Sequence, residues 1–276
     1  TKTIKSVFMG GKMKIYIPTR GRISTQTTWQ SIGDWGRQNA CLVCPESEVS
    51  SHIHRGRNVL SRGDVTGINN VREFIMDHAI ENRIEKIIML DDDLIFGKRI
   101  SSHGPSLRKT TEDDMYHLFE RMYSLLNEFK HVGVSPRQMN DKHYPHVLKH
   151  GMRINAVHGL RPLDISKYEI RYNDVDLMED YYMTLSLFAK GQPNAVIVDW
   201  TWDQRGGSGQ KGGCSNYRTP ELQEQASHKL AELFPDFVKV VEKETKTGWE
   251  GMKKRYDVRV QWKRAFKAGC PERSSN

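Results

Sequence analysis

The sequence lacks the features that mark membrane, secreted and disordered proteins. No apolar run approaches the roughly 20 residues needed to cross a bilayer, and the basic start at residues 1–12 has no apolar stretch of signal-peptide length. Apolar residues make up 37% and charged residues 28% of the 276 residues, a composition typical of a folded chain. We expect a cytoplasmic protein without a membrane partner, in which residues 1–12 are an upstream remnant outside the fold.

Cysteine is also scarce, since the chain contains four: Cys41, Cys44, Cys214 and Cys270. The first two have the C-x-x-C spacing that is found in zinc sites. Both lie inside an apolar, strand-like segment, however, where residues three apart point to opposite faces. We therefore expect reduced core thiols rather than a zinc site.

Basic residues outnumber acidic ones by 42 to 34, which gives a formal net charge of +8. Such an excess suits a polyanionic partner or an anionic small substrate. It is also common on ordinary soluble proteins. The charge alone therefore does not select a function.

The first half of the chain alternates short apolar segments with helical patterns. Residues 13–18 and 40–45 are β-rich and end in proline, and residues 85–90 form an apolar segment. Before this last segment, Asn70 and Glu73 have the spacing of an N-cap and its capping-box partner. Strand, helix and strand in this order predict an α/β fold with a mainly parallel sheet covered by helices on both faces.

The middle of the chain is less regular. Thr111 is placed to cap a helix whose apolar stripe faces the core. Residues 155–160 and 194–198 are strand-like, and a helix is expected from Glu179 to Gly191, with the glycine as its C-terminal cap. Helices and strands therefore continue to alternate through this part.

The C-terminal part begins with the segment 204–218, which carries five glycines and no periodicity and predicts a mobile loop. Thr219 and Pro220 then supply an N-cap and a first-turn proline for another helix. Residues 256–263 alternate apolar and polar side chains, as an edge strand does. Because we find no internal repeat and no dividing linker, we expect one domain over residues 13–276.

Asp91, Asp92 and Asp93 directly follow the apolar segment, and residues 94–96 are apolar again. Carboxylates a few ångströms apart raise one another's pKa unless a cation is present. Their oxygens suit a hard divalent ion, and Mg²⁺ or Mn²⁺ typically takes one or two carboxylates together with substrate phosphates. A solvated acidic turn is the alternative.

The order of these motifs resembles the GT-A glycosyltransferases. Pro-Thr-Arg-Gly-Arg ends the first strand, Gly-Ile-Asn-Asn-Val-Arg opens a helix, and the aspartates match the D-x-D motif that holds metal and sugar nucleotide in that family. Leu-Met-Glu-Asp-Tyr-Tyr at 177–182 is similar to the acidic motif at the start of the family's acceptor-side helix. With its late helix and basic tail, the pattern looks most like the phage TET-associated glycosyltransferases, which decorate 5-hydroxymethylpyrimidines in DNA.

The resemblance implies a GT-A-like, Rossmann-type arrangement of the whole domain. Residues 13–110 would form the nucleotide-sugar-binding half and residues 111–203 the acceptor half. The glycine-rich loop at 204–218 would act as a lid on the diphosphate, and residues 219–276 would form a C-terminal helix with a basic tail.

The resemblance also implies a metal-dependent donor site. Asp93 would ligate Mn²⁺ or Mg²⁺, Asp91 would meet the ribose or the metal, and His228 would be a third metal ligand, although it is equally a solvated surface residue. The residues expected to bind the UDP-sugar are Pro18, Thr19, Arg20, Arg22, Arg72, Asp91, Asp92, Lys211 and Arg218. For the arginines, surface solvation is the alternative.

The acidic motif would supply the base that accepts the proton of the acceptor hydroxyl. We assign this role to Asp180, with Glu179 orienting the acceptor. The alternative is that both carboxylates only complement the positive end of the helix dipole. His158 either touches the sugar or acceptor or is a hydrogen-bonded core histidine.

The predicted function is metal-dependent transfer of a sugar from a UDP-sugar to the hydroxyl of 5-hydroxymethylcytosine in phage DNA, in the host cytoplasm. A polysaccharide or protein acceptor is one alternative, and a non-catalytic nucleic-acid-binding protein is another. Cations expected around the DNA are Arg137, Lys142, Arg153, Arg161, Arg205, Lys211, Lys253, Lys254, Arg255 and Lys263. Aromatic residues expected to stack on a flipped base are Tyr144, Tyr181 and Trp202.

Overall fold

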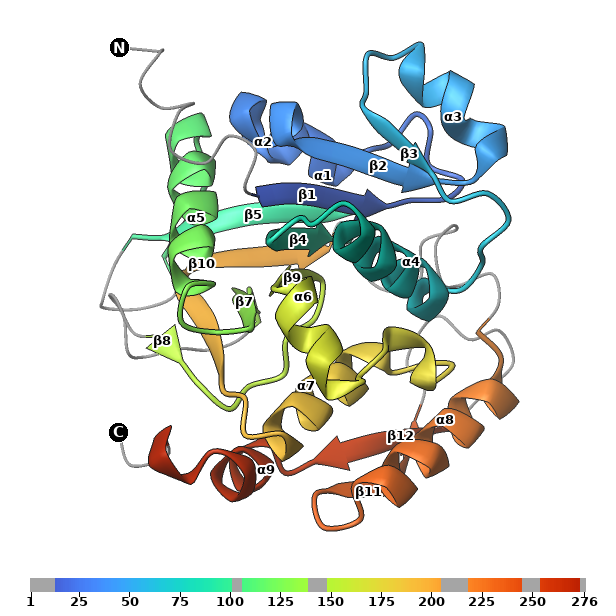
Figure 1. Cartoon of the computed structure of the whole chain (residues 1–276), viewed down its shortest axis with the longest axis vertical. Coiled ribbons are helices and arrows are strands. Elements are labelled where there is room, and N and C mark those ends of the chain that lie inside the picture. Colours follow the sequence, from blue (N-terminus) through green and yellow to red (C-terminus); the bar gives the residue numbers. More distant parts are fainter. Residues whose placement is uncertain (1–12, 101–105, 139–147, 205–217, 245–253, 274–276) are drawn as a thin grey trace.

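A ten-stranded sheet forms the centre of the computed structural model, which describes residues 13–100, 106–138, 148–204, 218–244 and 254–273 (Figure 1). Its strands are β1 (Met13–Pro18), β2 (Ala40–Cys44), β3 (Val59–Ser61), β4 (Lys86–Leu90), β5 (Leu94–Arg99), β6 (Leu107–Lys109), β7 (His131–Pro136), β8 (Leu148–Lys149), β9 (Val157–Leu160) and β10 (Asn194–Gln204). They are ordered β3-β2-β1-β4-β9-β7-β10-β5-β6, with β8 paired to β10.

The sheet is mixed and mostly parallel, as predicted. Strands β3, β2, β1 and β4 pair in parallel at one side, and β7 pairs in parallel with β10. Strand β9 lies antiparallel between β4 and β7, and β5 and β8 run antiparallel to β10. The four parallel strands at one side therefore bring their carboxyl ends to a common edge.

Helices cover both faces of the sheet (Figure 1). They are α1 (Thr27–Ser31), α2 (Gly33–Asn39), α3 (Glu46–Ile53), α4 (Ile68–Glu81), α5 (Glu112–Leu125), α6 (Pro162–Ile165), α7 (Glu179–Ala189), α8 (Pro220–Leu233) and α9 (Trp262–Gly269). The apolar stripe of α5 packs on the face that carries Ile15 and Ile88, which confirms its predicted core side. Helices α4 and α7 pack on the other face, around Tyr16 and Met89. No helix within the described ranges is long and apolar enough to span a bilayer.

Two predicted helix starts had different outcomes. Thr111 caps α5 in a reciprocal capping box with Asp114, as its sequence position predicts. The box predicted at Asn70 is wrong, because α4 already begins at Ile68 after Gly67, whose φ of +85° suits glycine. Glu73 is not free to return to the helix start, since it accepts the backbone N–H of Tyr172 at 2.7 Å.

The C-terminal part contains a hairpin that the sequence pattern revealed only in part. Helix α8 begins at Pro220 with Thr219 as its cap, as predicted. The alternating segment forms β12 (Lys254–Val260), but its partner is β11 (Val238–Glu244) in a separate two-stranded antiparallel sheet. Strand β12 ends at Val260, three residues before the predicted end at residue 263, because Trp262 begins α9.

Cys41 and Cys44 are buried and free in β2, which confirms the expectation of reduced core thiols. Burial raises the pKa of Cys41 to about 12 and that of Cys44 to about 11, so both thiols stay protonated. Other predictions lie outside the described residues: those for the segment 1–12, for most of the loop at 204–218 including Arg205 and Lys211, and for Lys142, Tyr144, Cys214 and Lys253.

Candidate active site

The three aspartates lie in the turn between β4 and β5, at the edge where the parallel strands end (Figure 1). The backbone N–H of Asp91 donates to the carbonyl of Ala156, just before β9, at 2.9 Å. The segment after β1 reaches the same place, because β1 and β4 are neighbours in parallel register. Ligands of open α/β sheets bind outside the carboxyl ends of the strands, so this edge is the expected position of a site.

Asp92 ties the segment after β1 to the aspartate turn. Thr19 Oγ1 donates to Asp92 Oδ2 at 2.6 Å, Arg22 Nη1 pairs with Oδ1, and Gln26 Nε2 supports Thr19 Oγ1 at 2.7 Å. Burial raises the pKa of Asp92 to about 6, although Arg22 and Thr19 oppose the shift. Both oxygens of Asp92 are thus engaged in holding Thr19 and Arg22 in place.

Asp93 has looser contacts than its neighbour. Arg22 Nη1 lies 3.2 Å from Asp93 Oδ2, and Gln204 Nε2 donates to Oδ1 at 3.3 Å. Gln204 is the last residue of β10, and it pairs with Leu94 of β5, the residue after Asp93. It was not predicted. Among the three aspartates, Asp93 therefore carries the longer hydrogen bonds, which a ligand can replace more readily.

Arg72 joins the aspartates to the acidic motif. From the first turns of α4, its Nη2 lies 3.0 Å from Asp91 Oδ1 and its Nη1 lies 2.8 Å from Glu179 Oε1. Burial alone would lower the pKa of Arg72, but the two carboxylates raise it above its usual value. Burial raises the pKa of Asp91 to about 7 in spite of Arg72, and it also raises the pKa of Glu179. The surface-solvation alternative does not apply to Arg72, which is 4% exposed.

Asp180 is held by a second arginine, which is half-buried. Arg153 donates to Asp180 Oδ2 from both Nε and Nη2, at 2.6 Å each. The same guanidinium donates to the Tyr181 hydroxyl at 2.7 Å and lies 3.8 Å from its ring centroid, and the Tyr181 ring packs on Trp262 at 5.6 Å. Both contacts between Arg153 and Asp180 go to Oδ2 of the Asp180 carboxylate.

His158 is a buried core histidine, the second of its two expected roles. It is fully buried on β9, stacks on His131 at 5.4 Å and lies 3.2 Å from the Tyr172 hydroxyl. Burial lowers the pKa of both histidines, that of His131 to about 3. The Arg72 guanidinium lies 5.8 Å from the centroid of the Tyr172 ring. The arginine therefore packs against this neutral cluster.

The structure does not bring His228 to the aspartates. His228 is exposed on α8 and faces the Tyr256 ring of β12 at 6.0 Å. Over the described ranges, no group of three or more His, Cys, Asp or Glu residues is arranged to hold a metal ion. A three-ligand protein site that combines His228 with Asp91 and Asp93 is therefore not formed.

Other predicted residues lie at the rim or in the core. Pro18 is half-buried and Arg20 is exposed at the end of β1. Burial raises the pKa of Glu179 and of Tyr181, and Arg218 lies close enough to oppose both shifts. Trp202 cannot stack on a base, because it is 6% exposed and its indole N–H donates to the Val134 carbonyl at 2.8 Å.

Arg62, which follows β3, was missed by the sequence reasoning. It is 5% exposed, and it forms no ion pair with another described residue. Burial and the nearby Arg20 lower its pKa. A lone arginine after a short strand gives no functional signal in the sequence. The charge of Arg62 becomes unusual only in the fold, where it is buried beside Arg20.

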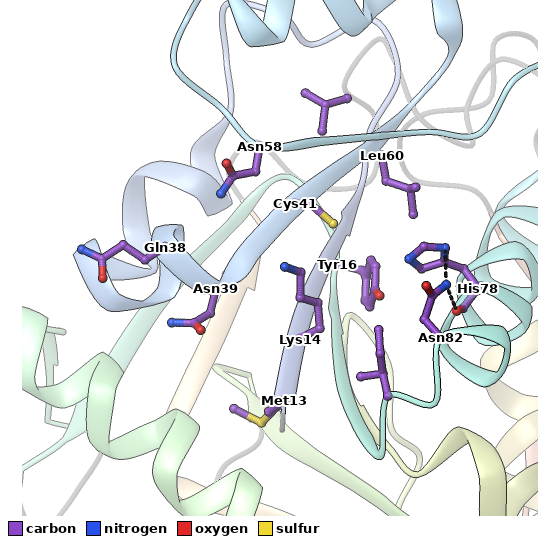
Figure 2. Close-up of a pocket in the computed structure, with 12 residues that line it drawn as sticks. Met13, Lys14, Tyr16, Gln38, Asn39, Cys41, Asn58, Leu60, His78 and Asn82 are labelled. Atoms are coloured by element: carbon purple, nitrogen blue, oxygen red, sulfur yellow. Dashed lines mark hydrogen bonds between the residues drawn. The ribbon is translucent and has the colours of Figure 1, made fainter. Parts of the chain in front are cut away.

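A separate pocket of about 670 Å³ opens at the opposite end of the strands (Figure 2). Lys14 and Tyr16 of β1, Cys41 of β2, and His78 and Asn82 at the end of α4 are among its lining residues. Figure 2 shows Tyr16 beside His78, whose ring centroids lie 5.9 Å apart. No carboxylate lines this pocket, so it is not part of the aspartate site.

Comparison with known proteins identifies a family. Residues 13–213 match the family model described as TET-Associated Glycosyltransferase. No curated protein sequence matches the chain. Among solved structures, a mycobacterial protein aligns with a TM-score of 0.50 at 8% identity, covering 93% of this chain and 85% of that one, which shows a shared fold.

Two further structures align less closely. Mycobacterium tuberculosis glucosyl-3-phosphoglycerate synthase has a TM-score of 0.47 at 10% identity, covering 82% of this chain and 80% of its own. Staphylococcus aureus TarS 1–349 in complex with UDP has a TM-score of 0.45 at 10% identity, covering 80% and 65%.

Proposed function

Because this chain belongs to the TET-associated glycosyltransferase family, we propose that it transfers a sugar from a nucleoside diphosphate sugar to 5-hydroxymethylcytosine in phage DNA. We expect the donor to be UDP-linked. The observation that carries the proposal is the Arg72 bridge, because it sets the donor-side Asp91 beside the acceptor-side Glu179. Donor and acceptor would then meet within the reach of one side chain.

The residues at the aspartate turn fit a divalent cation. Asp91, Asp92, Asp93, Glu179 and Asp180 face three arginines, Arg22, Arg72 and Arg153, so the cluster keeps two negative formal charges (five minus three). Asp93 and Asp91 would hold Mn²⁺ or Mg²⁺, since such ions need one or two protein carboxylates when phosphates supply the remaining ligands. When bound, the ion would offset the charge of the departing diphosphate.

On the donor side, Arg20, Arg62 and Arg218 would bind the anionic donor. Exposed Arg20 and buried Arg62 follow β1 and β3, where their positive charge would favour a diphosphate. Arg218 begins the segment before α8, within electrostatic reach of Glu179. Thr19 and Arg22 keep the aspartate turn in position through Asp92.

On the acceptor side, Asp180 Oδ1 would accept the proton of the hydroxymethyl group. The hydroxyl oxygen forms the bond to the anomeric carbon, and the bond from that carbon to the diphosphate oxygen breaks, so that the diphosphate leaves with the electron pair. Arg153 would fix the orientation of Asp180 through Oδ2. Glu179, held by Arg72, would orient the acceptor rather than take its proton.

The test is mass spectrometry of nucleosides from DNA containing 5-hydroxymethylcytosine, after incubation with the protein and a panel of sugar nucleotides. We expect the mass of one sugar to be added to 5-hydroxymethylcytosine with one of the UDP-sugars. DNA containing cytosine or 5-hydroxymethyluracil serves as the control for the base. Transfer to a saccharide or peptide, with no product on any DNA, would reject the acceptor but not the glycosyltransferase activity.

A further inference from the structure

The β11–β12 hairpin has one apolar face and one cationic face. Side chains alternate along a strand, and the face that carries Val238, Val258 and Tyr256 packs on α8 and its neighbours. The residues of the other face, as the strand register pairs them, are Lys239 with Arg259, Val241 with Asp257, and Lys243 with Arg255. Four cations and one carboxylate leave this outer face with a formal charge of +3.

The pairing of like charges on the outer face is unfavourable without a partner. Lys239 lies directly opposite Arg259, and Lys243 directly opposite Arg255, an arrangement that destabilises an antiparallel pair. Asp257 relieves the second pair, with Lys243 Nζ at 2.8 Å and Arg255 Nη2 at 3.7 Å. Lys239 and Arg259 form no ion pair with any other described residue. The positive charge of Lys239 and Arg259 is therefore available to an anionic partner outside the described part of the chain.

The cationic face borders the candidate active site. Strand β12 ends at Val260, and Trp262 packs its ring against Tyr181, the residue after Asp180. Burial raises the pKa of Tyr181, and Asp257 of the outer face adds to the shift, so that face lies within electrostatic reach of the site. Lys239 and Arg259, next to the Val238–Val260 pair, are at the end of the hairpin nearest to Trp262.

We infer that the outer face of the β11–β12 hairpin binds the phosphate backbone of the DNA acceptor and presents the duplex to the site beside Tyr181. This inference rests on the proposed function. The two cation pairs are four residues apart, about 13 Å at ~3.3 Å per residue, close to the roughly 12 Å width of a major groove. They can thus contact phosphates on both sides of one groove. The hairpin lies beyond residue 213, where the match to the family model ends.

The experiment compares two double variants by fluorescence anisotropy with a labelled duplex that contains 5-hydroxymethylcytosine. Lys239→Gln with Arg259→Gln removes the cation pair of the outer face. Lys229→Gln with Lys267→Gln removes the same charge from the same part of the chain, but from exposed positions on α8 and α9 rather than from the hairpin. Thermal denaturation and UDP binding are measured for both variants, to show that each is folded.

We expect the outer-face variant to bind the duplex roughly sixtyfold more weakly at 0.1 M salt, since each phosphate contact contributes about eightfold there. Its log-log salt slope should be about 1.8 smaller in magnitude than that of the wild type, and its melting temperature should not fall, because a like-charge pair is removed. The control should bind within about twofold of the wild type. Equal weakening of both variants, or of neither, would overturn the inference and leave the proposed function standing. A wild-type protein that neither binds nor modifies the duplex at low salt would reject the function, and the inference with it.

Discussion

Replacing Arg72 with methionine should destabilise the protein strongly at alkaline pH. The substitution keeps most of the side-chain volume but leaves Glu179 and Asp91 without their shared cation. Removing one partner of a buried ion pair costs about 3–5 kcal/mol. The Glu179 side chain is 9% exposed and should contribute close to the full amount, whereas Asp91 at 28% is better solvated and should contribute less. We expect the free energy of unfolding to fall by about 4 kcal/mol at pH 8.

The loss should shrink at lower pH, because a carboxylate without its cation can take up a proton instead. Asp91 already has a pKa of about 7 and Glu179 a raised one, so at pH 5 Asp91 is neutral with or without Arg72 and its contribution disappears. Urea unfolding in EDTA at pH 5 and pH 8 measures the effect. A double variant that combines R72M with Glu179→Gln should regain about 1–2 kcal/mol of the lost free energy of unfolding at pH 8. A loss that is the same at both pH values, with no recovery in the double variant, would refute the buried bridge.

Three other predictions address the metal, the base and the core histidines. UDP should bind weakly in EDTA and much more tightly with Mn²⁺ by calorimetry, and Asp93→Ala should abolish the difference; equal binding in both buffers would reject a metal role for Asp93. Asp180→Asn should lower the transfer rate by about 10² or more with UDP binding retained, and Glu179→Gln should lower it less. Wild-type turnover in D180N would show that the Asp180 carboxylate only complements the helix dipole. Because the folded pKa of His131 and of His158 lies below the unfolded value of about 6.5, the free energy of unfolding should fall as the pH drops below 6.5, with His131 contributing about 2 kcal/mol at pH 5. Urea unfolding across this range should show a shallower slope for His131→Asn, and an unchanged slope would contradict the assignment.

The parts of the fold that the sequence predicted are those that depend on local pattern. The buried strand before Asp91, the apolar stripe of α5 and the caps at Thr111 and Thr219 each follow from residues within a few positions of one another. The start of α4 was misplaced because the capping rule favoured Asn70, while Gly67 could adopt a positive φ. Strand β11 was missed because its valines are interrupted by charged residues, and nine residues, 245–253, separate it from its partner β12.

The site itself was predicted as a set of residue types but not as a set of contacts. The sequence indicated the aspartates, Arg72 and the acidic motif, yet nothing local links Arg72 to Glu179, which lies 107 positions away. Arg153 appeared as a DNA-facing cation because it is basic and lies in an irregular segment. Its actual position against Asp180 depends on the packing of α7 against the segment before β9. Ion pairs between distant segments are set by the tertiary fold, and the periodicity of the sequence does not predict them.

The charge balance of the site would allow an acidic centre and the proposed polyanionic acceptor to coexist in one protein. Each carboxylate of the cluster is paired with Arg22, Arg72 or Arg153, and the two negative charges that remain match one divalent ion. A centre balanced in this way would repel a phosphate backbone little once the ion and the donor are bound. The cations that form no ion pair with another described residue include Arg62 after β3 and Lys239 with Arg259 on the hairpin, all outside the cluster. The positive charge available for anions is therefore kept at the edges, where a diphosphate and a DNA backbone would each reach it without crossing the aspartates.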